Sequence, residues 1–138
     1  MTQAIDIRVA GLHLTARLLT DAAHRACATV LNMLPLHAHL LQARWSGEAA
    51  WIPLGDLDLD LPYENATSHP GPGHLLLHLG GLSETEILLP YGPTLFASKV
   101  GQLAGSHFAT VEDGLGSLAE IGRRVVWEGA QDVTIEPR

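Results

Sequence analysis

The sequence predicts a mainly β fold, a closed barrel with two helices over its open ends. Short segments in which apolar and polar residues alternate recur along the 138-residue chain. Only two segments have the three- and four-residue apolar spacing of a helix. A parallel sheet would need a helix after nearly every strand, so the barrel is the better interpretation. The length fits one domain, predicted to span residues 1–138.

Composition excludes several classes of partner. Eight Lys and Arg against fifteen Asp and Glu give a net charge of −7, whereas nucleic acid or an anionic membrane surface requires a basic patch. The single cysteine, Cys27, excludes an internal disulfide and a multi-cysteine zinc site. Asp6 and Arg8 interrupt any secretion signal, and the apolar runs are too short for a membrane span. We therefore expect a cytoplasmic protein with no nucleic-acid or membrane partner.

The chain is expected to begin with two strands and a helix. Residues 5–9 and 12–18 alternate around Gly11, which predicts a hairpin with one buried face. Thr20 or Asp21 is placed to cap a following helix, and Pro35 ends it. The apolar stripe of this helix consists of Ala23, Cys27, Val30, Leu31 and Leu34.

Most later elements are predicted to be strands. Residues 36–53 have a strand pattern with a tight turn at 46–48. Alternating Asp and Leu over 54–62 indicates an edge strand with a solvated acidic face, because a calcium site needs glycine-bearing turns. The remaining elements are expected to be strands over 75–79, 85–89, 94–100 and 106–111, a helix over 114–124, and one or two β segments over 125–135.

Several long motifs carry a resemblance to a known family. They are NATSHPGPG, HLGGLSETEIL, YG…FASKVGQLAGSHFAT and GR…WEGAQ. Through them the chain from Arg44 to Gln131 resembles an uncharacterised bacterial family, a domain of unknown function with the cyclophilin-like β-barrel fold. The resemblance implies a closed eight-stranded antiparallel barrel with a helix at each end, in agreement with the residue pattern. That family has no established reaction, so the resemblance implies no chemistry.

The resemblance also implies kinship with a wider superfamily that includes prolyl isomerases. The site of those enzymes has an arginine on a strand, set beside aromatic residues in an open groove. This sequence has only two Phe and lacks the Phe-His-Arg and Gly-Gly-Asp-Phe runs of those enzymes. Here Gly80 and Gly81 are followed by Leu82 and Ser83. We therefore do not expect prolyl isomerase activity.

Candidate catalytic residues lie in and just after the turn-rich stretch from Glu64 to Gly92. Glu84 and Glu86 fall on the same face of a strand, where mutual repulsion raises the pKa of one and yields an acid and a base. The alternative is an exposed hairpin with two solvated acids. His107 is a further candidate, because an imidazole transfers protons near neutral pH.

Candidate ligand-binding residues surround these acids. Asn65, Ser68 and His69 offer amide, hydroxyl and imidazole groups in a short loop, which suits recognition of a small polar ligand. Alternatively, these groups satisfy their own backbone. Trp51 and Tyr91, next to turn residues, are expected to be pocket walls, whereas Phe96 is expected in the core.

Eight histidines raise the alternative of a metal-dependent barrel enzyme. His74 and His78 share a strand face, as do His37 and His39. Cupin barrels follow such a His-x-His with a nearby Glu, but the next acid after His39 is Glu48, too far along the chain. We therefore predict no metal ligands and no cofactor.

Together these patterns predict a small-molecule-binding barrel with its pocket at one end. If the protein is an enzyme, acid/base hydrolysis or isomerisation of a small polar metabolite is the expected reaction class. The rival hypothesis is a non-catalytic binding or structural subunit, and homo-oligomer formation is expected, with residues 36–41 packed against a second copy. Full exposure of Glu84 and Glu86, with no concavity beside them, would favour the rival.

Overall fold

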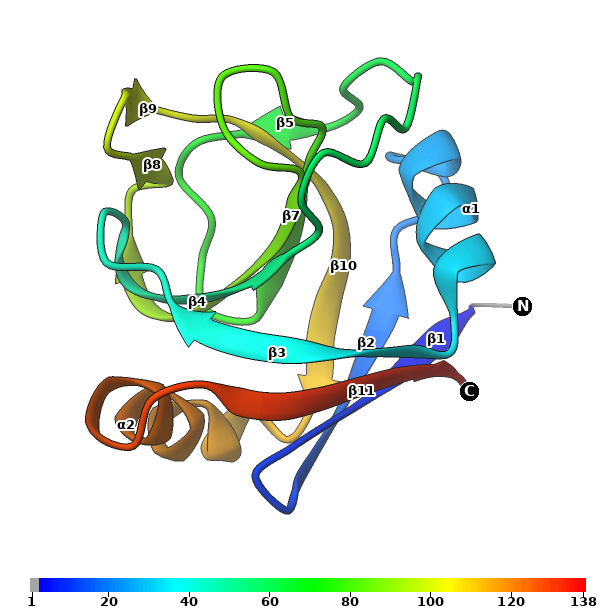
Figure 1. The fold of residues 1–138 in the computed structure, drawn as a ribbon. Coiled ribbons are helices and arrows are strands. Elements are labelled where there is room, and N and C mark those ends of the chain that lie inside the picture. Colours follow the sequence, from blue (N-terminus) through cyan, green and yellow to red (C-terminus); the bar gives the residue numbers. More distant parts are fainter. Residues whose placement is uncertain (1–2) are drawn as a thin grey trace.

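The computed structural model describes residues 3–138, in which eight strands close into an antiparallel barrel (Figure 1). Because β10 pairs with both β6 and β2, the sheet has no open side. This arrangement confirms the predicted fold class. The strands follow one another around the barrel in the order β2 (Leu12–Leu18), β1 (Ala4–Val9), β11 (Gln131–Pro137), β3 (Leu36–Gln42), β4 (Gly47–Pro53), β7 (Glu86–Thr94), β6 (His74–His78) and β10 (Gly105–Asp113).

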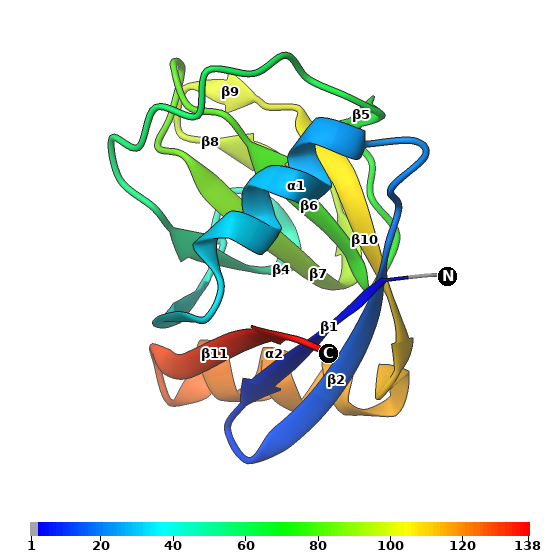
Figure 2. The same ribbon diagram turned by 90° about the vertical axis from the view of Figure 1, so that its right-hand side faces the viewer.

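The barrel interior is filled by the apolar faces of these strands and by the two helices. Ile5, Ile7 and Val9 point inward from β1, as their alternation predicts. The helices α1 (His24–Met33) and α2 (Leu118–Trp127) lie on different sides of the strands and cover the ends of the barrel (Figure 2). Their contributions to the interior cluster are Ala26, Cys27 and Val30 from α1, and Leu118, Ile121 and Val125 from α2.

The cap predicted for the first helix is wrong. Helix α1 begins at His24, and neither Thr20 nor Asp21 caps it. Instead Glu64 Oε1 accepts hydrogen bonds from the backbone N–H groups of Arg25, at 2.8 Å, and Ala26, at 2.9 Å. A carboxylate suits this position because the first N–H groups of a helix lack intrahelical partners and carry partial positive charge. The capping group is thus supplied by a segment distant in sequence.

The edge strand predicted over residues 54–62 is also wrong. This segment is an irregular loop, with Asp56 and Asp58 exposed and Leu59 packed on the barrel interior. A closed barrel leaves no free strand edge for it to pair with, and alternation alone cannot make a strand without a partner. The loop is held to the start of β7 by Thr85 Oγ1, which donates to the Leu57 carbonyl at 2.6 Å.

Other elements differ from prediction mainly in their bounds. The strand predicted over 94–100 is reduced to a hairpin of β8 (Ala97–Ser98) and β9 (Gly101–Gln102). The second helix is preceded by a 3₁₀ turn, η1 (Leu115–Ser117), and continues to Trp127, three residues past the expected end at Arg124. A single strand, β11, follows it. One unpredicted short strand, β5 (Ala66–Thr67), pairs with the start of β10.

We expect Glu64→Ala to lower the free energy of unfolding by about 1 kcal/mol, because two backbone N–H groups of α1 lose their acceptor. Urea denaturation at pH 7 measures the change. Glu64→Gln is the matched control, since it keeps an oxygen acceptor and should lose less. An equal loss in both variants would assign the effect to charge alone and contradict the capping role.

Candidate functional site on the outer wall of the barrel

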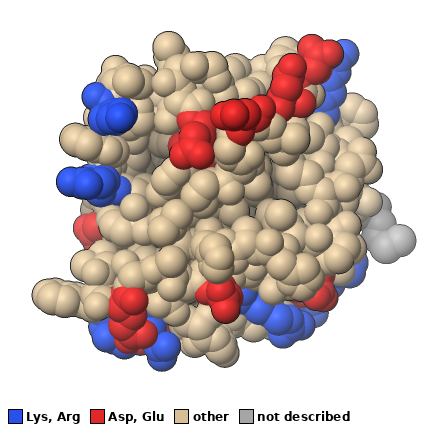
Figure 3. Space-filling view, viewed as in Figure 1, with Lys and Arg blue, Asp and Glu red and all other residues tan. Residues whose placement is uncertain are grey.

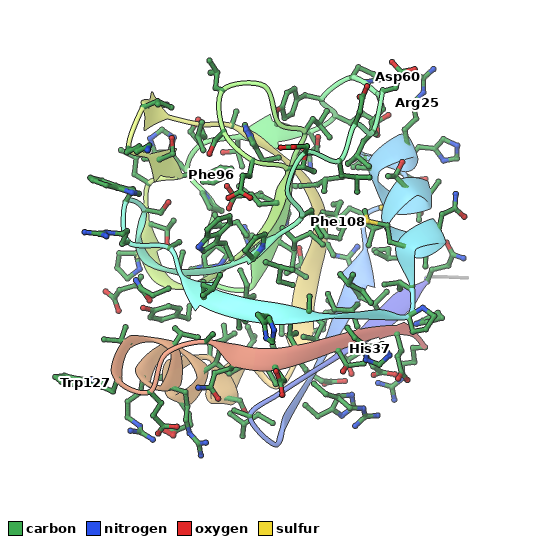
Figure 4. The ribbon with its side chains drawn as sticks, in the orientation of Figure 1. Arg25, His37, Asp60, Phe96, Phe108 and Trp127 are labelled. Carbon is green, nitrogen blue, oxygen red and sulfur yellow. The ribbon has the colours of Figure 1, made fainter. Side chains whose placement is uncertain are left out.

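A second apolar cluster lies outside the barrel wall. On β7 the side chains of Ile87 and Leu89 point into the barrel, so Glu86 and Leu88 point outward. Residues 95–104, here called the flap, contain β8 and β9 and cover this outer face, with Phe96 directed inward (Figure 4). Polar side chains on this part of the wall are therefore buried. The cluster consists of Ala43, Ala49, Leu76, Leu88, Phe96 and Leu103.

Hydrogen bonds fix the flap to two neighbouring segments. The buried Ser46 hydroxyl donates to the Ala97 carbonyl at 2.9 Å and accepts from the Ala97 N–H at 3.0 Å. The Phe96 N–H donates to the Ser68 carbonyl at 2.8 Å. The flap is thus attached both to the β3–β4 turn and to the segment before β6.

A hollow of about 360 Å³, here called the outer-face pocket, lies between the flap, the β3–β4 turn and the start of β7. The Arg44 guanidinium lies 5.3 Å from the centroid of the Trp45 ring, which orients both side chains at the rim. Figure 3 shows basic side chains over the β3–β4 and β8–β9 turns. The polar and aromatic residues that line the pocket are Gln42, Arg44, Trp45, Trp51, Ser83, Glu86, Ser98 and Lys99.

Glu86 is the buried ionisable group of this pocket. Its side chain is only 5% exposed. Burial, and secondarily the neighbouring Glu84 carboxylate, raise the pKa of Glu86 to about 8. The carboxyl group therefore carries its proton at neutral pH. A neutral carboxylic acid both donates and accepts hydrogen bonds, so this group is suited to proton transfer.

Glu84 lies in a different environment. Its side chain is exposed and lines a separate hollow of about 500 Å³ with Asp56 and Asp58. The acidic side chains in the upper part of Figure 3 follow the 54–62 loop. Ser83 lines both hollows, whereas Glu84 lines only the first of them and Glu86 only the outer-face pocket.

His107 lies on β10, away from the outer-face pocket. Its half-buried ring stacks on His74 with centroids 4.5 Å apart, and its Nε2 is 3.0 Å from the Thr110 hydroxyl. Burial and the neighbouring His74 lower the pKa of His107. The imidazole is therefore neutral at physiological pH. Its contacts with His74 and Thr110 fix its position on the barrel wall.

The hydrogen bonds of the loop over residues 65–69 are made mainly to backbone groups. The Asn65 side-chain amide donates to the His107 carbonyl at 3.0 Å, while the His107 N–H donates to the Asn65 carbonyl at 3.1 Å. The His69 N–H donates to the Thr67 hydroxyl at 3.0 Å, and Ser68 anchors the flap through its carbonyl. The Asn65 side chain thus binds the backbone of β10, whereas the Thr67 hydroxyl binds a backbone N–H of its own turn. Ligand binding by Asn65, Ser68 and His69 stays a prediction.

Tyr91 is held against the second helix. Its hydroxyl donates to Gln42 Oε1 at 2.6 Å, and its ring lies so close to Gly122 that a Cβ there would collide with it. Burial raises the pKa of Tyr91. Phe96 is a buried core residue, as predicted, and it belongs to the outer of the two apolar clusters.

The structure does not bring the predicted site residues together at one end of the barrel. Of these residues only Glu86 and Trp51 line the outer-face pocket. The roles suggested for the others stay predictions. Sequence reasoning missed Arg44, Ser98 and Lys99, and the signal that existed was a basic residue beside Trp45 at a predicted turn.

Residues 3–138 contain no group of three His, Cys, Asp or Glu side chains arranged to hold a metal ion. Within the same range, no helix has the length and apolar character needed to cross a membrane.

Comparison with known proteins identifies a family and a fold. The sequence pattern of the family described as "Protein of unknown function (DUF3830)" matches residues 5–136. The search of curated proteins found no match. The solved structure of McbB in complex with tryptophan is similar at a TM-score of 0.73 and 19% identity, covering 96% of this chain but only 44% of McbB. The hypothetical protein AF2241 from Archaeoglobus fulgidus is similar at a TM-score of 0.66 and 13% identity, covering 98% of this chain and 94% of that protein.

The raised pKa of Glu86 predicts a specific pH dependence of stability. An unfolded Glu ionises near pH 4.5, whereas folded Glu86 ionises near pH 8. Between these values the folded state holds a proton that the unfolded state releases, so the free energy of unfolding falls as pH rises, by at most about 1.4 kcal/mol per pH unit. Glu86→Gln should remove this fall and be more stable than the wild type at pH 9, measured by urea denaturation from pH 5 to 9.

Glu84→Gln is the matched control for this measurement. It removes the neighbouring charge, so it should lower the pKa of Glu86. The free energy of unfolding should then still fall with rising pH, but over a narrower pH range. If Glu86→Gln kept the wild-type pH dependence, the buried carboxyl would not be its source.

Proposed function

We propose a function for this chain, which belongs to the DUF3830 family of proteins of unknown function, from the geometry of its outer-face pocket. The pocket binds a small anionic molecule with a flat apolar part, and Glu86 acts on it as acid or base. The single observation that carries the proposal is a buried, protonated carboxyl at a hollow rimmed by cations and indole rings.

Charge favours an anionic ligand. Arg44 and Lys99 line the pocket from the β3–β4 turn and the flap, and neither forms an ion pair with another residue in the range 3–138. Guanidinium and ammonium groups make charge-assisted hydrogen bonds to carboxylate or phosphate. The chain as a whole is strongly acidic, so a local pair of cations stands out as a recognition feature.

The aromatic lining of the pocket favours a ligand with a flat apolar part. Trp45 and Trp51 together account for two of the three tryptophans, and both line this one pocket. Indole rings offer broad apolar faces on which planar groups stack. McbB was solved in complex with tryptophan, a small molecule with an aromatic ring and a carboxylate. We propose a ligand of comparable size for the present chain, with an aromatic ring and a carboxylate but with a net negative charge.

Glu86 supplies the chemistry. A carboxyl group with a pKa near 8 exchanges protons readily at physiological pH, as efficient general acids and bases do. This supports acid/base hydrolysis or isomerisation of a small polar metabolite. Glu86 is the proposed catalytic residue, and Ser98 of the flap, which lines the same pocket, is proposed to orient the ligand.

The rival hypothesis required both acids to be exposed without a concavity beside them. Glu84 is exposed but lines one hollow, and the buried Glu86 lines another, which supports a binding site over a purely structural subunit. A homo-oligomer formed through residues 36–41 and a cytoplasmic location stay proposals from the sequence.

Indole-3-acetate, with its uncharged amide indole-3-acetamide as the matched probe, tests this proposal. By isothermal titration calorimetry at pH 7 the wild type should bind the acetate more tightly. Lys99→Gln and Arg44→Gln should each weaken acetate binding by about 3- to 10-fold, because each removes a charge-assisted contact, and should leave amide binding nearly unchanged.

The same titration repeated at pH 9 tests Glu86. Ionisation of Glu86 places a negative charge in the pocket, so acetate binding should weaken above pH 8 in the wild type and not in Glu86→Gln. Equal affinity for the acetate and the amide in every variant would contradict an anion site. Loss of binding in Glu64→Gln, which lies outside the pocket, would show that the effect is not local.

A further inference from the structure

Two exposed histidines on β3 lie outside the outer-face pocket and take no part in the proposed function. His37 and His39 project from the outer face of the barrel, whereas the residues that alternate with them pack on its interior. Figure 4 shows His37 where β3 and β11 run side by side. Together with Asp132 and Thr134 of β11, the two histidines line a hollow of about 460 Å³.

Both imidazole rings are held through the same nitrogen. His39 Nδ1 is 3.2 Å from Asp132 Oδ1, and His37 Nδ1 is 3.3 Å from the Thr134 hydroxyl. These partners are the residues directly opposite on β11. A carboxylate only accepts hydrogen bonds, so the neutral His39 ring carries its proton on Nδ1, and the Thr134 hydroxyl accepts from His37 in the same way. Each ring then presents Nε2 as a free lone pair on the outer face of β3.

This arrangement is typical of histidines that bind a metal ion. Such a histidine coordinates through one ring nitrogen and donates the other N–H to an acceptor such as a carboxylate, which fixes the tautomer and orients the ring. His37 and His39 are about 6.6 Å apart along the strand, a spacing at which two imidazoles converge on one divalent ion. Along the chain the next acid after His39 is Glu48, which is the reason that the sequence predicts no metal ligands. Strand pairing instead sets Asp132 directly opposite His39.

One chain offers two ligands to such an ion, whereas Zn²⁺ prefers four at the corners of a tetrahedron. Residues 3–138 contain no group of three His, Cys, Asp or Glu side chains that would complete the set. A second copy related by a two-fold axis presents the same two histidines, and both rings are exposed to it. Each chain has a net charge of −7, so a divalent cation on the axis also reduces the repulsion between the copies.

We infer that His37 and His39 are ligands of a divalent transition-metal ion, best matched by Zn²⁺, that is shared by two copies of this chain. The four imidazoles bind the ion through Nε2. Asp132 and Thr134 are positioning residues that hold the rings from β11, and the two Asp132 carboxylates balance the charge of the ion. This site is independent of the outer-face pocket, because no residue lines both hollows.

Titration of zinc chloride into the full chain, purified without a histidine tag, tests the inference by calorimetry and by light scattering after size exclusion. The wild type should bind one Zn²⁺ per two chains and double its mass, and EDTA should reverse the change. His37→Gln and His39→Gln each remove a ligand, so each should abolish the increase in mass. Asp132→Asn should weaken zinc binding by about 10-fold, because the His39 ring loses its carboxylate acceptor.

His24→Gln is the matched control, since His24 is an exposed histidine on α1. It should bind zinc and double its mass as the wild type does. X-ray absorption at the zinc edge should show four imidazole nitrogens at about 2.0–2.1 Å in the wild-type complex. Three outcomes would overturn the shared site. They are no zinc binding by the wild type, an undiminished increase in mass in His37→Gln and His39→Gln, and one ion per chain with no change in mass.

Discussion

Closure of the sheet between β2 and β10 is the constraint on which the rest of the molecule depends. It gives every barrel strand a partner on both sides, so that backbone hydrogen bonds are satisfied around the whole wall. It also fills the interior with apolar side chains from strands and from both helices. Functional groups are therefore confined to loops and to the outer wall. The position of the outer-face pocket follows from this exclusion.

The flap covers part of the outer wall and buries side chains there. An outward-facing carboxyl on a barrel strand would ordinarily be solvated, with an ordinary pKa. Here Phe96 and Leu103 bring the flap down on Leu76 and Leu88, and Glu86 lies within the covered area. Burial of these apolar side chains stabilises the folded state, and this gain offsets the free-energy cost of burying a carboxyl beside them. Packing outside the barrel thereby sets the acidity of a group inside the pocket.

Local pattern was sufficient for the strands that pair with sequence neighbours. Alternation around Gly11 placed β1 and β2, and strand alternation correctly placed His74 and His78 on one face of β6, opposite the inward Leu75 and Leu77. It failed for 54–62, where alternation has no strand to pair with. It failed also for the cap of α1, because the acceptor is Glu64, 38 residues beyond Ala26 in sequence. Each failure involves a partner that periodicity does not specify.

By itself, the sequence determined the β-rich class and the two helices, because these depend on residue spacing along one strand or helix. Only the tertiary structure decided that Glu86 is buried and Glu84 exposed, two residues apart on the chain. It alone also placed Arg44 and Lys99 around the same hollow and set Asp132 opposite His39. Burial, charge proximity and register depend on which distant segments meet. Contacts between those segments result from closure of the barrel and docking of the flap, not from any local pattern.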